Sequence, residues 1–260
     1  MRKDLECVTW KAIVLFTVLK ERKMAGTLQG KTVLVIGRGS GISRAIVDAA
    51  IAEGARVIAA GRNREALEAA YKETGVSVES VDVTDENSIV ALAETLGPVD
   101  HVVSTASARA KGALGELSAE AILTSFRTKV VGPIILAKHF APRMPATGSF
   151  VMFSGASALR PEPGFLAVGA TNGAVDTVVR SLAVELAPIR VNAVSPGTVD
   201  SGAWDGLGES KAPFFEKMAA ANPVRRIGAP EDIAQAVIFA LTNTFMTGVS
   251  MAIDGGQPLV

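Results

Sequence analysis

The sequence predicts one doubly wound α/β domain, with a parallel sheet of about seven strands covered by helices on both faces. Three observations lead to this fold class. Short runs rich in β-branched residues alternate with segments of helical length. The runs are apolar throughout, which fits strands that are buried on both faces. The 260 residues, 48% of them hydrophobic, suffice for one large core, and no Pro-, Gly- or Ser-rich linker divides them.

The predicted strands follow one another along most of the chain. They are 31–36, 55–60, 76–81, 99–104, 149–154, 189–195 and 249–254. Helix-length segments between them imply right-handed crossovers and therefore parallel strands. We expect the domain to occupy residues 26–260, after an N-terminal extension at 1–25.

The extension contains an apolar run of eight residues, 12–19, which Thr17 interrupts. It is far shorter than the ~20 residues that a membrane-spanning helix needs, so no membrane span is expected. Two interpretations stay open. The segment forms an interfacial or partner-docking helix, or translation starts at Met24, where "MAGTLQGKTVLVIG" is a natural opening for the domain.

Charge and cysteine content exclude several classes of protein. The 26 basic and 26 acidic residues cancel without forming a basic stripe, which argues against a nucleic-acid partner. The single Cys7 excludes an internal disulfide, and one Cys with two His excludes a Cys/His zinc cluster, so no metal is expected. A reducing, cytoplasmic setting is the simplest interpretation.

The loop after the first strand predicts nucleotide binding. It reads "GRGSGIS" and begins the first helix of a strand–helix–strand unit. Glycines there allow a tight turn and let the backbone approach a pyrophosphate at the helix N-terminus. A glycine cluster also simply ends strands, but this placement strengthens the nucleotide interpretation. The candidate binding residues are Gly37, Arg38, Gly39, Ser40, Gly41 and Ile42.

Five motifs in the same order resemble those of the short-chain dehydrogenase/reductase family, over about residues 26–256. The glycine turn resembles the family's TGxxxGIG, with Ile36 in place of Thr and Ser43 in place of the last Gly. The other four are "VDVTD" (81–85), "IRVNAVSPG" (189–197), "RRIGAPEDIA" (225–234) and "TGVSMAIDGG" (247–256).

The resemblance implies a Rossmann fold and places several residues around a nicotinamide dinucleotide. Asp82 would hold the adenine amino group, with Val83 beside it, and Pro196 and Gly197 would lie beside the nicotinamide. Family members usually associate through two long helices, here about 118–140 and 168–187, so the resemblance also implies a homodimer or homotetramer.

The second strand predicts NADP(H) as the cofactor. An NAD site needs an acidic residue at the end of this strand to accept from the ribose 2′-hydroxyl. Here Gly61 and Arg62 follow the strand, and Arg38 lies in the glycine turn. Two guanidinium groups without a carboxylate fit a 2′-phosphate. The alternative is that both arginines are only solvated.

The four catalytic residues of the family are all replaced. Its tyrosine, lysine, serine and asparagine positions correspond to Val168, Asn172, Gly155 and Lys129, with Ser154 next to the missing serine. No other alignment supplies them. The one tyrosine of the chain is Tyr71, and the only lysines after Lys138 are Lys211 and Lys217.

Lysine and asparagine have exchanged places relative to the family pattern. If both point into one cavity, a desolvated Lys129 with a lowered pKa is available as a proton donor or imine-forming amine. Asn172 and Ser154 complete the candidate catalytic set, and the loss of the serine side chain at Gly155 is expected to enlarge the cavity. The alternative is that Lys129 points to solvent or to a neighbouring carboxylate.

Three functions remain open from the sequence. The first is an NADP(H)-dependent oxidoreductase that reduces a small carbonyl or enoyl substrate without a tyrosine. The second is an inactive nucleotide-binding pseudoenzyme that acts as a sensor or partner subunit, and the third is a structural subunit without cofactor. His101 and His139 are expected to be packed or exposed. Arg109, Lys111 and Arg160 are expected on loops at the substrate side, where they hold an anionic ligand or are only solvated. Trp204, Phe214 and Phe215 belong to a region, 198–222, that resembles the family's mobile lid.

Overall fold

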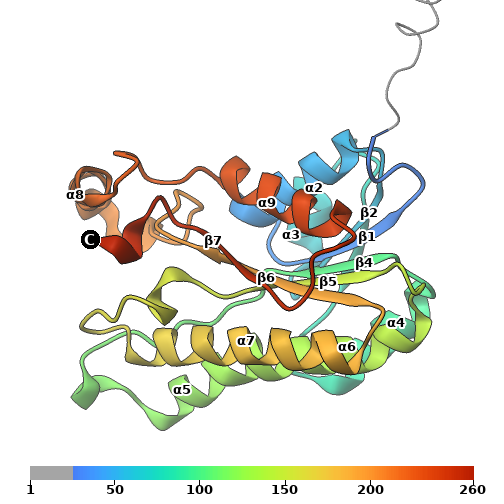
Figure 1. Cartoon of the computed structure of the whole chain (residues 1–260), viewed down its shortest axis with the longest axis horizontal. Helices are drawn as coiled ribbons and strands as arrows, with labels where there is room; N and C mark the ends of the chain where they lie inside the picture. The colour runs from blue at the N-terminus through green and yellow to red at the C-terminus, as the bar shows by residue number, and fades with distance from the viewer. Residues whose placement is uncertain (1–25) are drawn as a thin grey trace, which may run out of the picture.

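Seven parallel strands form one sheet in the computed structural model, which describes residues 26–260 (Figure 1). The expected extension at 1–25 lies outside the described residues. The strands are β1 (Thr32–Ile36), β2 (Arg56–Gly61), β3 (Ser77–Ser80), β4 (His101–Ser104), β5 (Ser149–Phe153), β6 (Arg190–Pro196) and β7 (Ser250–Ile253). Their order across the sheet is β3-β2-β1-β4-β5-β6-β7, so the predicted fold class and all seven predicted strands are confirmed.

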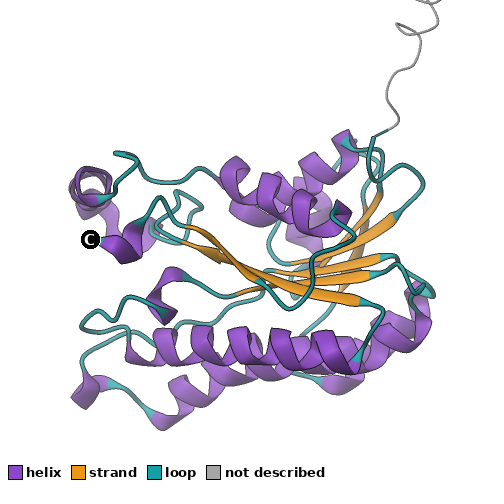
Figure 2. Cartoon of the chain, in the orientation of Figure 1, coloured by secondary structure: helices purple, strands orange, loops and turns teal. Residues whose placement is uncertain are grey.

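Helices cover both faces of the sheet, as Figures 1 and 2 show. One layer consists of α2 (Gly41–Ala52), α3 (Arg64–Ala70) and α9 (Pro230–Thr242). The other consists of α4 (Glu86–Leu96), α5 (Ala119–Phe126), α6 (Gly132–Phe140) and α7 (Leu166–Glu185). A further helix, α8 (Lys211–Ala221), lies beyond the ends of the strands, on the left in Figure 1.

Alternating side chains of each strand fill two hydrophobic cores. In β1, Val33 and Val35 pack with residues of α2 and α9, whereas Leu34 and Ile36 pack with residues of α4, α6 and α7. All four are nearly inaccessible to solvent. Because both faces are buried, each strand is an apolar run rather than an alternating one, and this is the pattern from which the fold was predicted.

The strand order reverses between β1 and β4. In sheets of this kind, ligands bind outside the carboxyl ends of the strands at such a reversal. The glycine turn after β1 and the loop after β4 meet there, so this edge of the sheet positions the candidate site.

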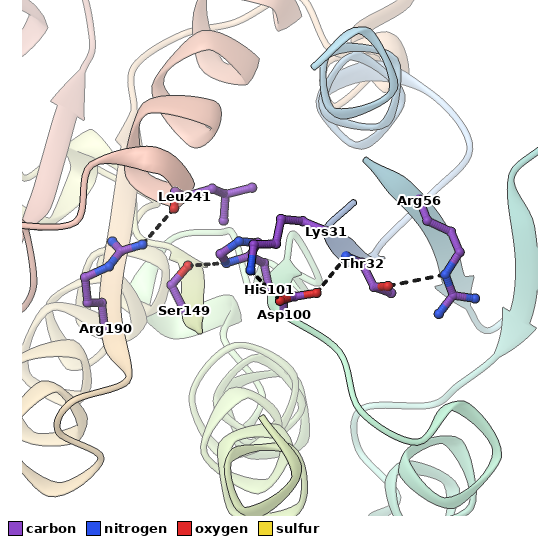
Figure 3. Close-up of polar contacts among 8 residues, drawn as sticks. All are labelled: Lys31, Thr32, Arg56, Asp100, His101, Ser149, Arg190 and Leu241. Carbon is purple, nitrogen blue, oxygen red and sulfur yellow. Dashed lines mark hydrogen bonds and ion pairs between the residues drawn. The ribbon is translucent and has the colours of Figure 1, made fainter. Parts of the chain in front are cut away.

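The opposite, amino edge of the sheet carries a row of polar contacts (Figure 3). His101 Nδ1 lies 2.9 Å from Ser149 Oγ, and Lys31 donates to Asp100 Oδ1 at 3.0 Å. The guanidinium of Arg190 donates to two carbonyl oxygens at the end of α9, each at 2.7 Å. His101 is thus buried at the edge away from the glycine turn. Of the two expected alternatives, packed or exposed, it is packed.

Within residues 26–260, no helix combines the length and the apolar character that crossing a bilayer requires. The same part of the chain contains no group of three or more His, Cys, Asp or Glu side chains that could hold a metal ion.

Candidate active site

The glycine turn lies against two other segments that leave no room for side chains. A Cβ atom at Gly37 would lie 2.1 Å from Thr105 Oγ1 and 2.2 Å from Ser43 Oγ. These two hydroxyl oxygens are 2.6 Å apart, so they join the start of α2 to the loop after β4. Gly41 has a φ of +58°, and a Cβ there would lie 2.2 Å from the carbonyl oxygen of Ser201. Glycine is therefore required at both positions.

The start of α2 is free to accept an anion from the side of this turn. Ser40 is the N-cap residue, but its side chain makes no hydrogen bond to the helix. The first-turn N–H groups of a helix have no partner within the helix, and they favour negative charge. A bare backbone turn followed by an uncapped helix N-terminus fits the pyrophosphate of a dinucleotide.

The other predicted cofactor residues lie at the same edge of the sheet. Arg38 and Arg62 are exposed at the ends of β1 and β2, and neither forms an ion pair with any residue of the described domain. Asp82 Oδ1 accepts from the backbone N–H of Thr84 at 2.9 Å and from its hydroxyl at 2.7 Å. These bonds, with a smaller contribution from Arg62, lower the pKa of Asp82 and keep it ionised. Val83 follows β3, Pro196 ends β6, and Gly197 comes directly after it.

The two residues predicted to have exchanged places contact each other directly. Lys129 lies in a π-helical turn, Arg127–Val131, between α5 and α6, and such turns are frequent at functional sites. Its amine donates to Asn172 Oδ1, on α7, and to the carbonyl oxygen of Ser154 at 3.0 Å. Lys129 is 7% exposed and Asn172 2%, so the alternative of a lysine that points to solvent is wrong.

The third candidate residue, Ser154, is hydrogen-bonded to the backbone of Asn172. Ser154 Oγ donates to the backbone carbonyl of Asn172 at 3.1 Å, and Asn172 Nδ2 donates to the carbonyl oxygen of Gly155 at 3.2 Å. A Cβ at Gly155 would lie 2.8 Å from Asn172 Nδ2. The expectation that Gly155 enlarges the cavity is therefore wrong, because the Asn172 amide occupies the space beside it.

The surroundings of Lys129 lower the pKa of its ammonium group. Burial, with a smaller contribution from the charge of Arg109, lowers the pKa of Lys129 to about 7. Asp176 opposes this shift. It follows Asn172 by one turn of α7, and its Oδ1 atom is buried without a hydrogen-bond partner in the described domain. Sequence reasoning missed Asp176, although its i, i+4 spacing from Asn172 places both on one face of a helix.

Cations and aromatic rings from the loops after β4 and β6 form a second cluster. Trp204 lies 4.8 Å from Phe214 between ring centroids, and Phe214 lies 5.9 Å from Phe215. Arg109 and Lys111 contact Trp204. The structure therefore brings together five of the residues that were expected near the substrate.

Three other residues considered from the sequence have contacts that explain their positions. Arg160 lies 3.7 Å from Glu162, and His139 lies 2.7 Å from Glu86. Tyr71, the one tyrosine of the chain, is buried at the end of α3. Burial there raises its pKa to about 12, which makes it a weaker acid than a free tyrosine.

Sequence comparisons match almost the whole domain. The family model described as "Enoyl-(Acyl carrier protein) reductase" matches residues 36–257. A short-chain dehydrogenase/reductase from Stachybotrys chlorohalonatus (strain IBT 40285) is 32% identical over 248 residues, which cover 88% of this chain and 98% of that relative.

Solved structures agree with the sequence matches. A small-chain dehydrogenase in complex with NADPH superposes with a TM-score of 0.78 at 29% identity, over 88% of this chain and 99% of that chain. BdcA, also in complex with NADPH, superposes with a TM-score of 0.81 at 28% identity, over 89% of this chain and 96% of that chain.

Proposed function

Because this chain belongs to the short-chain dehydrogenase/reductase family, we propose that it is an NADP(H)-dependent oxidoreductase that uses Lys129 as its proton donor. The substrate is a small carbonyl or enoyl compound. The observation that carries the proposal is the buried amine of Lys129, which is held by Asn172 and by the carbonyl oxygen of Ser154 beside the candidate cofactor site.

The glycine turn and the residues around it support NADP(H) binding. The N-terminus of α2 would hold the pyrophosphate, and Arg38 and Arg62 would hold the 2′-phosphate through charge-assisted hydrogen bonds. Asp82 is an ionised acceptor at the adenine end, and Pro196 and Gly197 would lie at the nicotinamide end. When bound, the cofactor would supply a hydride to the substrate carbon.

Lys129 supplies the proton that the substrate needs. An ammonium group has three N–H donors, and two of those on Lys129 go to Ser154 and Asn172. The third is free for the oxygen of the substrate. With a pKa of about 7, the ammonium is both populated and acidic at neutral pH, which is the condition for an effective general acid. The proton passes to the substrate oxygen, and the neutral amine regains a proton from solvent.

Binding and turnover test the two parts of the proposal separately. Calorimetry with NADPH and NADH measures cofactor preference, and we expect Arg62→Ala to weaken NADPH binding at least about tenfold while leaving NADH unchanged. NADPH oxidation with a panel of aldehydes, ketones and enones measures turnover. We expect Lys129→Met to lower kcat by about 10²- to 10⁴-fold without a change in NADPH affinity.

A matched control separates this role from a general effect of lysine removal. Lys138 is an exposed lysine on α6 that pairs with Glu86, so Lys138→Met should retain full activity. Equal turnover by wild type and Lys129→Met would contradict the proton-donor role. Tight NADPH binding without any turnover would instead favour the nucleotide-binding pseudoenzyme, and absence of NADPH and NADH binding would leave a structural subunit.

A further inference from the structure

The loop after β4 presents two cations from a fixed position. Ser125 Oγ, on α5, donates to the carbonyl oxygen of Ala108 at 2.6 Å. The backbone N–H of Gly112 donates to the carbonyl oxygen of Gly164 at 3.1 Å, which joins this loop to the one before α7. Arg109 and Lys111 lie between these two attachments, so their backbone is held against both neighbouring elements.

Aromatic rings, rather than carboxylates, surround these cations. Lys111 Nζ lies 4.2 Å from the ring centroid of Trp204 and 4.7 Å from that of Phe165. The guanidinium carbon of Arg109 lies 5.8 Å from the centroid of Trp204. Trp204 belongs to the segment that follows β6, so the two cations and both rings come from three different loops at the carboxyl edge.

No ion pair of the described domain neutralises these two cations. In the described domain, no carboxylate lies within 4.0 Å of Arg109 or Lys111, and Glu162 pairs with Arg160 instead. Both residues are exposed overall, but partial burial and then the charge of Arg38 lower the pKa of Arg109. Partial burial and then Arg109 lower the pKa of Lys111, and the charge of Glu162 opposes this second shift. Like charges held together in this way favour a bound anion.

We propose that Arg109 and Lys111 bind the oxyanion group, a carboxylate or phosphate, of an acidic substrate, with Trp204 covering it. This inference rests on the proposed function, since it names the substrate class of the same site. The charge of Arg38 contributes to the lowered pKa of Arg109, and the charge of Arg109 contributes to that of Lys129, so the Arg109 guanidinium lies near both residues. A carbonyl at Lys129 and an acid group at Arg109 and Lys111 would belong to one molecule.

Two sources could supply the oxyanion, namely the substrate and the phosphates of the cofactor. The substrate is favoured because Arg38 and Arg62 already flank the glycine turn, whereas Lys111 contacts rings outside it. A fluorescence titration distinguishes them. The chain has two tryptophans, Trp10 and Trp204, so a Trp10→Phe background leaves Trp204 as the only reporter.

The titration uses this background with NADP⁺ at saturation and without turnover. The probes are 4-oxopentanoate, its uncharged methyl ester, and inorganic phosphate. We expect 4-oxopentanoate and phosphate to change the Trp204 emission, and the ester to bind at least about tenfold more weakly than the acid. Arg109→Ala and Lys111→Met should each weaken binding of the acid about tenfold or more, and leave NADPH affinity within about twofold.

An exposed lysine elsewhere provides the control. Lys217→Met, on α8, should bind both acid probes as wild type does. Equal binding of acid and ester, no response to either acid probe, or unchanged acid binding by both variants would overturn the inference. A loss of NADPH affinity in Arg109→Ala and Lys111→Met would also overturn it, because the oxyanion would then be the cofactor's.

The failure of this inference is distinguishable from that of the proposed function. Turnover of neutral carbonyls that depends on Lys129, without acid binding, leaves the proposed function intact and removes the oxyanion site. Acid binding reported by Trp204, without turnover of any carbonyl or enoyl compound, supports the oxyanion site in a protein that lacks the proposed activity.

Discussion

Exchanging residues 129 and 172 tests whether Lys129 and Asn172 act as one unit. The two side chains are buried and hydrogen-bonded to each other. Asn172→Lys alone would place a second amine against the first, whereas the double variant Lys129→Asn, Asn172→Lys would again contain one amine and one amide. We expect the single variant to be strongly destabilised and the double variant to recover most of the loss.

The size of the effect follows from the distance and from the pKa of Lys129. Two ammonium groups about 4 Å apart repel each other by about 4 kcal/mol at an effective dielectric constant near 20. With the pKa of Lys129 lowered to about 7, this amine is charged at pH 6 and mostly neutral at pH 8. The penalty of Asn172→Lys should therefore be largest at pH 6 and should shrink as the pH rises.

Urea denaturation at pH 6 and pH 8 measures the free energies of unfolding of wild type, both single variants and the double variant. The coupling energy of this cycle isolates the interaction of the two side chains. Asn172→Met is the matched control for size, because it also lengthens the side chain but adds no charge, so its penalty should change less between pH 6 and pH 8 than that of Asn172→Lys. Calorimetry with NADPH shows whether each variant retains its cofactor site.

Two results would refute this reasoning. A single variant Asn172→Lys as stable as wild type at pH 6 would mean that a second ammonium finds room or solvent there. A double variant no more stable than Asn172→Lys would mean that the two positions are not interchangeable, and that the exchange relative to the family pattern has no structural basis.

Three more predictions concern Lys129, His101 and Gly155. The rate of carbonyl reduction should fall as the pH rises through about 7, because Lys129 then loses its proton, and a pH profile of kcat/KM checks this, with no such step expected in Lys129→Met. Burial lowers the pKa of His101 to about 4, so between pH 6.5 and 4 only the unfolded chain binds this proton. The free energy of unfolding should therefore decrease by about 3 kcal/mol as the pH falls from 6.5 to 4. Urea denaturation of His101→Gln should lack this part of the pH dependence. Gly155→Ser should cost about 1–3 kcal/mol in thermal unfolding since its Cβ meets Asn172 Nδ2 at 2.8 Å, whereas Gly173→Ser on α7, with no atom within 4 Å of the added Cβ, should not show this loss.

The sheet could be predicted because its strands are buried on both faces. Residues such as Val33 to Ile36 must be apolar at every position when one face packs on α2 and α9 and the other on α4, α6 and α7. A continuous apolar run followed by glycines is a local signal, and it needs no knowledge of distant contacts. The predicted strands therefore agree with β1 to β7, and the largest shift of a start is at β4, from residue 99 to residue 101.

The candidate site could be predicted only by residue type. The sequence indicated that Lys129 and Asn172 had exchanged, but not that the Asn172 amide fills the space beside Gly155. It also gave no sign that Lys111 lies between Trp204 and Phe165, since these residues come from three loops far apart in the chain. Such contacts depend on how loops meet at the sheet edge, and local patterns carry no information about that.

The two halves of the candidate site differ in what holds them, and this bears on why the sequence predicts a glycine turn close to the family's motif but an exchange at residues 129 and 172. At the glycine turn, Gly37 and Gly41 are fixed by the backbone and side chains of other segments less than 2.5 Å from any added Cβ. A replacement there would displace the turn itself. At Lys129 and Asn172 the constraint is a hydrogen bond between two side chains on different helices. Such a bond requires one donor and one acceptor, but it does not fix which helix supplies which, so a paired exchange keeps the contact while it moves the amine.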